Sequence, residues 1–315
     1  YAKWEPKQYT VRFSFNADEG TLSGASEALV TYRKDFALPV LVSKDPCKTF
    51  YGWFESPNGE GIQYTDYTGS GLDVWKQAGD KILYAGWIDI FTFTPVENSV
   101  YGTVYSVAKG SGIDLVKSIK IPAYYNGLRV AYIYSTAFES CANLEVIEIP
   151  DTILQVDTGS VGGNQVGSAF LRCNNIQEVN VYVADPDKTY ETFYQSVDGV
   201  LLYRNASVGS QLELAYFPFG RTGEFTVPDG VEVIPQYVFK STKITEITIP
   251  SSVIRIDANV FDSCYSLTKI TFTGDSGDTL SINEAAFKGC SYLAEITLPA
   301  RISEFKPAML ASCSR

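Results

Sequence analysis

The sequence predicts a mainly β protein with short helical or 3-10 segments, in which a small N-terminal β module precedes an array of stacked repeats. Three observations support this fold class. One phrase recurs five times in the C-terminal part of the chain. Each copy ends in alternating apolar residues, the pattern of a strand with one buried face. The 21 Tyr and 18 Phe residues suit half-buried β surfaces.

The recurring phrase has a fixed internal spacing. A Phe is followed by Cys three residues later, by Leu or Ile three further on, and by apolar residues at the third and fifth positions after that. The Phe-to-Phe spacings from Phe239 onward are 22 and 26 residues, and Leu310 takes the Phe place 23 residues later. A unit of this length cannot bury its own apolar face and must stack on its neighbours, which predicts a solenoid. The copies begin at Ala137, Ala169, Val238, Val260 and Ala286.

Each repeat is expected to supply one strand of a parallel sheet on one face of the array. Within each strand the Ile-x-Ile alternation sends two apolar side chains inward and the residue between them outward. A proline then ends the strand at Pro150, Pro250 and Pro299, because proline cannot donate to the ladder. The outward residues are Glu148, Thr248, Thr271 and Thr297.

Two stretches outside the regular copies predict turns. Residues 116–130 read as a first repeat, with Ile119 and Ile121 inward and a turn at Asn126–Gly127. The spacing from Phe170 to Phe239 is 69 residues, three times 23, which predicts extra repeats or a hairpin in a divergent insertion at 182–227. Gly199 and Gly230 suit hairpin turns there.

Five of the six cysteines occupy one position of the repeat, so we expect a column of small buried thiols. Disulfides between repeats are the alternative, and a metal site is disfavoured because no CxxC pair is present. Cys47 lies outside the array and has no partner. The column residues are Cys141, Cys173, Cys264, Cys290 and Cys313.

The first 90 residues predict a separate β module. Strands are expected at 9–15, 50–54 and 81–87, with a turn-rich loop at 16–24 and a turn in SPNGEG. The phrase YAGW at 84–87, which ends the module, is similar to YAKW at 1–4, which opens the chain. We therefore expect residues 1–7 to be the closing strand of a preceding copy of the module; the alternative is that the similarity of the two tetrapeptides is a coincidence. Residues 88–95 are expected to be a short linker.

At these residues the sequence resembles two families of bacterial surface proteins. The phrase AF-x-x-C-x-x-L-x-x-I-x-I-P is similar to BspA-like leucine-rich repeats and covers 91–315. The order YTV-F-F-NA, LP, GWF and LYA-W resembles the internalin-type B-repeat over 8–90. The resemblance implies a β-grasp-like module followed by a leucine-rich solenoid, an extracellular location on the bacterial cell surface, and adhesion.

Composition excludes several function classes. The net charge of −11 disfavours nucleic acid and anionic lipid as partners. No run approaches the length of a membrane span, so no membrane insertion is expected. Histidine is absent, which excludes Ser-His-Asp, Cys-His and His-containing zinc sites. No enzyme activity, cofactor or metal is predicted, and the acid-rich turns near Asp18 and Asp278 are expected to be solvated.

Two sets of residues are candidates for ligand binding. An aromatic set in the divergent insertion is one, because tyrosines favour interfaces; the alternative is that these rings fill the core of an irregular repeat. The outward strand residues are the other. The carboxylates Glu148, Glu178, Glu246 and Glu295 are expected on the same exposed face, where an acid–base pair is the alternative, but an open strand face lacks the desolvated cleft that paired catalysis requires. The candidates are Tyr182, Tyr190, Tyr194, Tyr216, Glu148, Thr248, Thr271 and Thr297.

These patterns and the resemblance together predict a surface-binding protein, a monomer that recognises a host or matrix protein or a glycan. The alternative is a structural stalk or spacer that presents upstream domains and has no ligand of its own. An extended repeat surface is suited to either role.

Overall fold

The structure is a computed structural model that describes residues 6–15, 19–157, 168–185, 187, 192–206, 209, 211–274 and 278–313. Strands dominate, and the helical content of the described residues consists of short 3-10 turns such as η1 (Pro57–Gly59) and η2 (Ile113–Leu115). No helix among these residues is long and apolar enough to span a bilayer. The predicted mainly β class with short 3-10 segments is confirmed.

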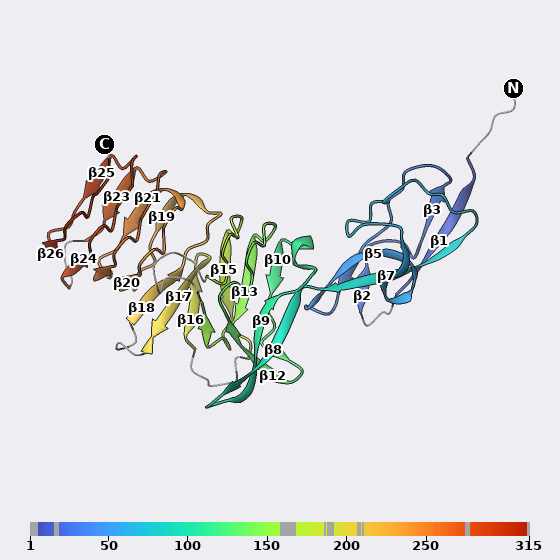
Figure 1. Cartoon of the computed structure of the whole chain (residues 1–315), viewed down its shortest axis with the longest axis horizontal. Coiled ribbons are helices and arrows are strands. Elements are labelled where there is room, and N and C mark those ends of the chain that lie inside the picture. Colours follow the sequence, from blue (N-terminus) through green and yellow to red (C-terminus); the bar gives the residue numbers. More distant parts are fainter. Residues whose placement is uncertain are drawn as a thin grey trace, which may run out of the picture. The chain divides into compact units, whose positions relative to one another are not determined.

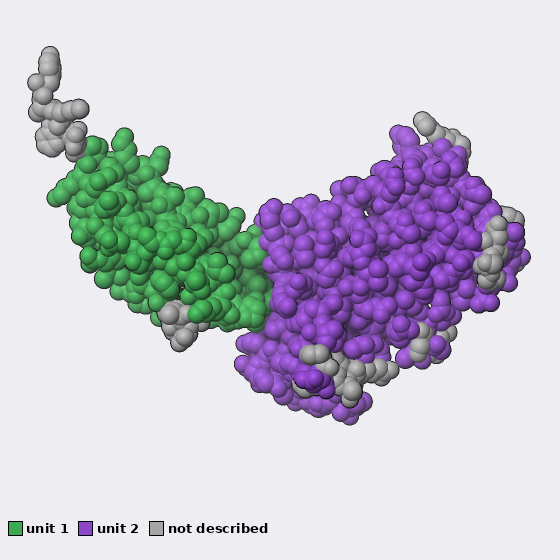
Figure 2. Space-filling view, turned by 180° about the vertical axis from the view of Figure 1, so that it is seen from behind, with its two compact units in different colours: residues 1–92, 109–116 green, residues 93–108, 117–315 purple. Residues whose placement is uncertain are grey.

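The chain divides into two compact units (Figure 2). Unit 1 contains residues 1–92 and 109–116, and unit 2 contains 93–108 and 117–315. Residues 88–95, predicted as a linker, are strand on both sides of Ile90. The expected closing strand at 1–7 lies mostly outside the described residues, since description begins at Pro6.

Unit 1 is built on a five-stranded mixed sheet of order β3-β1-β7-β5-β6 (Figure 1). The three predicted strands are present, and YAGW lies in the central strand, which pairs in parallel with β1 and antiparallel with β5. A small pair, β2 with β4, adds a strand where a loop was expected, because Thr21 and Leu22 continue an alternating pattern. The strands are β1 (Gln8–Ser14), β2 (Gly20–Leu22), β3 (Glu27–Thr31), β4 (Leu41–Ser43), β5 (Lys48–Ser56), β6 (Glu60–Gln63) and β7 (Lys81–Asp89).

The core of unit 1 lies around two fully buried tryptophans. Trp53 packs against Phe13 and Phe50 at ring distances of 4.6 and 5.4 Å, and donates its indole N–H to the Pro39 carbonyl at 2.7 Å. Trp75 lies against Tyr64 at 5.3 Å. Large rings of this kind contribute most of the apolar area that a module of this size can bury.

Unit 2 carries the predicted parallel ladder in two sheets of order β10-β13-β15 and β19-β21-β23-β25 (Figure 1). Ile119, Ile147 and Val179 are in register and buried, as the Ile-x-Ile alternation predicts. Each buried aliphatic side chain contributes roughly 1.5–3 kcal/mol. The strands are β10 (Ser118–Lys120), β13 (Val146–Pro150), β15 (Glu178–Tyr182), β19 (Thr222–Thr226), β21 (Lys243–Ile249), β23 (Lys269–Phe272) and β25 (Glu295–Thr297).

A second strand in each repeat was not predicted. After the proline turn the chain forms a short strand that pairs in parallel with its equivalent in the next repeat, for example Ile256 with Ile282. Its sequence signal is weak, because most of these strands are only two to four residues long. They are β12 (Leu128–Ile133), β14 (Gln155–Val156), β20 (Val233–Ile234), β22 (Arg255–Ile256), β24 (Leu280–Ile282) and β26 (Ile302–Phe305).

The first repeat of unit 2 includes a short hairpin and two longer strands. Strand β11 (Tyr124–Tyr125) pairs antiparallel with β12 through the turn Asn126–Gly127, whose φ values of 49° and 78° both lie in the left-handed region. This confirms the predicted turn. Strand β9 (Gly102–Lys109) pairs in parallel with β12, and β8 (Phe91–Asn98) lies next to β9 in the sheet.

The divergent insertion forms the hairpin that its spacing allowed. Strands β16 (Tyr194–Val197), β17 (Val200–Asn205) and β18 (Gln211–Tyr216) are antiparallel, and β18 then joins β20 in the second sheet. Gly199 occupies the two-residue turn between β16 and β17, as predicted. Gly230 also lies in a turn, but this turn connects β19 and β20 in different sheets rather than two paired strands.

Before the first strand of each repeat, the AF-x-x-C phrase packs a column of phenylalanines. Phe239, Phe261 and Phe287 are fully buried, with ring distances of 5.0 and 5.4 Å between successive rings. These contacts tie each repeat to the next, which explains why the phrase recurs in copy after copy.

The structure contains the predicted thiol column, in which four of the five cysteines are buried and Cys313 is half-buried. The Cys264 thiol donates to the carbonyl of Phe239 in the preceding repeat at 2.9 Å, and Cys290 and Cys313 repeat this contact at 3.3 and 3.1 Å. The copy that lacks cysteine has Thr242 in its place, whose hydroxyl donates to the same Phe239 carbonyl at 2.7 Å. All six cysteines are free.

Candidate binding surface

The open face of the sheet β19-β21-β23-β25 carries two rows of polar side chains. The first, here called the Thr row, places Thr226, Thr248, Thr271 and Thr297 side by side, because strand register pairs each with the next. Neighbouring strands lie about 4.8 Å apart, so the row repeats a hydroxyl at that interval. Thr226 and Thr297 are exposed, whereas Thr248 and Thr271 are half-buried by their neighbours on both sides.

The second row, here called the charged row, lies two residues earlier on the same strands. Register brings together Glu224, Glu246, Lys269 and Glu295. The ammonium of Lys269 lies 3.0 Å from the carboxylate of Glu295, and this hydrogen bond and charge raise the pKa of Lys269. With three carboxylates and one ammonium the row has a net charge of −2, so it favours a partner with neutral or basic groups.

The opposite faces of the same strands hold these rows in place. Ile247 and Ile270 are each 1% exposed. The hydrogen-bonded ladder between their strands, β21 and β23, fixes the backbone of both. A partner that binds the two rows therefore orders few backbone torsions, which reduces the entropic cost of binding.

The smaller sheet β10-β13-β15 presents a related group. Lys120, Glu148 and Asn180 are in register, and the Lys120 ammonium lies 3.4 Å from the Glu148 carboxylate. Lys120 also lies 4.2 Å from the ring centre of Tyr182, whose hydroxyl donates to the Ile121 carbonyl at 2.7 Å. Burial and the nearby Glu148 charge raise the pKa of Tyr182 to about 12, so its hydroxyl stays protonated. Two predicted site residues, Glu148 and Tyr182, therefore lie together.

The turn of the insertion hairpin lies next to both sheets. The Gly199 carbonyl accepts from the Val179 amide of β15 at 2.8 Å. The Asp198 carboxylate accepts from the Arg221 guanidinium, just before β19, at 2.8 Å. The outward side chains of the two sheets, together with this turn, are here called the strand face.

Tyr194 and Tyr216 do not belong to a binding surface, which corrects the prediction for them. Tyr194 is 8% exposed, and its hydroxyl accepts from the Val156 amide at 2.9 Å. Tyr216 is 4% exposed and packs against Phe170 at 5.0 Å. Both tyrosines instead fill the core of an irregular repeat, which was the alternative to a binding surface. The insertion folds back over the core and covers their rings. Tyr190 lies outside the described residues.

The sequence pattern placed Thr248, Thr271 and Thr297 of the Thr row and Glu246 and Glu295 of the charged row on the exposed face. It did not identify Thr226, Glu224, Lys269, Lys120 or Asn180. The signal was present two residues before each threonine, since a period of two places both positions on one face. The four charged positions were not identified as one row, because Lys269 carries the opposite charge to the carboxylates on either side of it.

The strand face is suited to non-covalent binding. Its carboxylates lie on an open sheet face rather than in the desolvated cleft that paired acid–base catalysis requires. In the part of the chain that the structure describes, no group of three Cys, Asp or Glu side chains is placed to hold a metal ion.

Comparison with known families decides the class of the repeats. A model of the BspA type leucine rich repeat region matches residues 112–196 and 215–315 in six copies. The chain belongs to this family. The unmatched residues 197–214 contain β17 and the start of β18, so the gap in the repeats of this BspA-type chain coincides with the insertion hairpin.

Solved structures with similarity to the chain come from bacterial leucine-rich repeat proteins. A leucine rich cell surface protein of Faecalibacterium prausnitzii is 20% identical with a TM-score of 0.40, and the match covers 63% of this chain and 58% of that one. A leucine rich repeat protein of T. pallidum is 16% identical with a TM-score of 0.40, over 72% of this chain and 87% of that one. The chain thus spans less than two thirds of the F. prausnitzii protein. None of the curated proteins compared matches the chain.

Proposed function

We propose that this BspA-type chain is a bacterial cell-surface binding protein, adhesin-like, that recognises a host or matrix protein or a glycan through the strand face. The observation that supports this most directly is the in-register Thr row beside the charged row on an open, rigid sheet. The family supports it in general terms, since such repeat proteins typically bind or act as scaffolds. The F. prausnitzii protein is described as a cell surface protein, which supports the location.

The architecture that we propose for this role has two parts. The repeats of 91–315 stack as a solenoid, so that successive strands extend one continuous face. Residues 8–90 form a β-grasp-like module of the internalin B-repeat type, supported by the five-stranded mixed sheet with YAGW on its central strand.

The test is a binding screen of the whole chain against immobilised collagen, fibronectin, laminin and a glycan array. The double variant Thr248→Arg, Thr271→Arg places two long cations in the middle of the Thr row without touching the buried face. Loss of this surface should weaken binding at least about tenfold.

The matched control is Thr21→Arg, because Thr21 is an exposed strand threonine of unit 1. Saturable binding that survives in this control and is lost in the double variant supports the proposal. Binding that the Thr21→Arg control and the double variant both retain would exclude the strand face as the binding site. No binding to any partner would favour the spacer alternative.

A further inference from the structure

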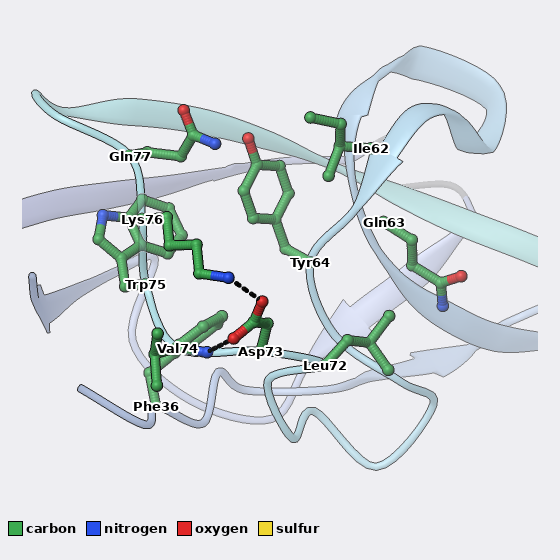
Figure 3. A pocket seen from close by; sticks show the side chains of 10 residues that line it. All are labelled: Phe36, Ile62, Gln63, Tyr64, Leu72, Asp73, Val74, Trp75, Lys76 and Gln77. Carbon is green, nitrogen blue, oxygen red and sulfur yellow. Dashed lines mark hydrogen bonds and ion pairs between the residues drawn. The ribbon is translucent and has the colours of Figure 1, made fainter. Parts of the chain in front are cut away.

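Unit 1 contains a cavity of about 230 Å³ that the strand face does not involve (Figure 3). It is formed where the chain leaves β6 and returns toward β7. Figure 3 shows Tyr64 in the middle of the side chains that line it. Ile62 and Leu72, which are 52% and 56% exposed, form its outer wall.

The Tyr64 hydroxyl is a buried polar group without a hydrogen-bond partner in the described part of the chain. Its residue is 8% exposed, and the oxygen has no hydrogen bond among the described residues. The backbone holds the residue firmly, because its amide donates to Trp53 at 2.8 Å and its carbonyl accepts from Leu72 at 3.0 Å. Leaving such a hydroxyl unsatisfied is costly, so a ligand that supplies a hydrogen bond there is favoured.

The lining of the cavity is apolar on its inner side. Trp75 lies 5.3 Å from Tyr64, and Phe36 meets Trp75 edge-on at 5.3 Å. The Trp75 indole N–H also lacks a partner among the described residues, but in Figure 3 it points away from Tyr64. We therefore assign the polar contact inside the cavity to the Tyr64 hydroxyl alone.

The rim of the cavity is polar and electrically balanced. The Asp73 carboxylate accepts from the Lys76 ammonium and from the Val74 amide, as the dashed lines in Figure 3 show. Gln77 adds a neutral amide to the lining. Because the two charges neutralise each other, the rim favours a neutral ligand with several hydroxyl groups over an anion or a cation.

We propose that this cavity, here called the Tyr64 pocket, binds one neutral sugar unit. Its volume lies below the range of about 300–1,000 Å³ typical of drug-sized ligands, which fits a single ring. A sugar ring has an apolar C–H face for the inner side and hydroxyls around its edge for the rim. A hydroxyl both donates and accepts, so it can satisfy the phenol of Tyr64 in either direction.

The test is saturation-transfer difference NMR of the whole chain with glucose, galactose, mannose and N-acetylglucosamine, and with glucuronate as an anionic comparator. At least one neutral sugar should bind saturably with a dissociation constant on the order of 1 mM, and glucuronate should bind more weakly. Tyr64→Phe removes only the hydroxyl and should weaken binding about tenfold. Tyr67→Phe makes the same change at a tyrosine outside the lining and should leave binding unchanged.

A second variant guards against a change in folding. Leu72→Arg lies on the exposed wall and should block the pocket while the thermal unfolding of unit 1 stays the same. The proposal is wrong if none of the neutral sugars binds saturably, if glucuronate binds more tightly than they do, or if Tyr64→Phe and Leu72→Arg bind like the unchanged chain. Because this pocket lies in unit 1, these outcomes are separate from those of the strand-face screen.

Discussion

The phenylalanine column makes a quantitative prediction at Phe261. This ring is fully buried and lies between Phe239 and Phe287, with which it stacks at interplanar angles of 2° and 22°. Replacing Phe261 by Ala removes the ring and leaves a cavity, which costs about 3–5 kcal/mol. Because two ring contacts are lost rather than one, we expect about 4–5 kcal/mol, the upper half of that range.

The assay uses the position of the tryptophans. All four lie in the first 87 residues, so their fluorescence reports unit 1, whereas far-UV circular dichroism reports the whole chain. In urea titrations Phe261→Ala should shift the dichroism transition of unit 2 to lower urea and leave the fluorescence transition in place.

The matched control is Tyr265→Ala, in the same repeat, where the ring is 60% exposed. Its cost should stay within about 0.5 kcal/mol. If Phe261→Ala costs no more than Tyr265→Ala, the column does not hold the repeats together. If the fluorescence transition moves as far as the dichroism transition, the two units do not unfold separately.

Three further predictions concern the repeats of unit 2. Cys264→Ala removes a buried sulfur and its hydrogen bond to Phe239, and should cost about 2 kcal/mol in urea titrations, with no change on reduction because the thiol is free. Ser263 has a φ of 62°, and the equivalent position of the next repeat is Gly289, with a φ of 74°. Ser263→Gly should therefore raise the free energy of unfolding by about 0.5–1 kcal/mol. A lower free energy of unfolding would contradict the assignment of backbone strain to Ser263. Burial raises the pKa of Tyr194 to about 12, above the value of 10 in the unfolded chain, so its contribution is complete below pH 10 and is lost between pH 10 and 12. Tyr194→Phe should flatten the fall of stability over that window, and an identical pH profile would exclude this residue as a cause.

Much of unit 2 could be predicted because its pattern is local. The alternation around Ile147 and Ile247 specifies which side chains are buried within one strand, and the recurrence of the phrase specifies that strands stack in parallel. The cysteine column follows from the same period. The short second strands escaped prediction, because two or three residues such as Arg255–Ile256 carry too little alternation to stand out.

The candidate site could be predicted only in part. Thr248 and Thr271 lie on the strand face because alternation alone determines the face of a residue. The tyrosines of the insertion could not be assigned from the sequence, because a tyrosine suits both a core and an interface. Their burial depends on whether the insertion folds back over Phe170 and Val156, which are far from it in sequence.

The sequence by itself thus determined the period, the inward and outward faces, the cysteine column and the mainly β class. Each of these depends on residues within one repeat or on its exact recurrence. The tertiary structure alone decided which rings are covered, where the Asp198–Gly199 turn lies between the sheets, and that Tyr64 retains a hydroxyl without a partner. The physical reason is that burial and hydrogen bonding at these positions depend on neighbours from distant parts of the chain, which no local pattern encodes.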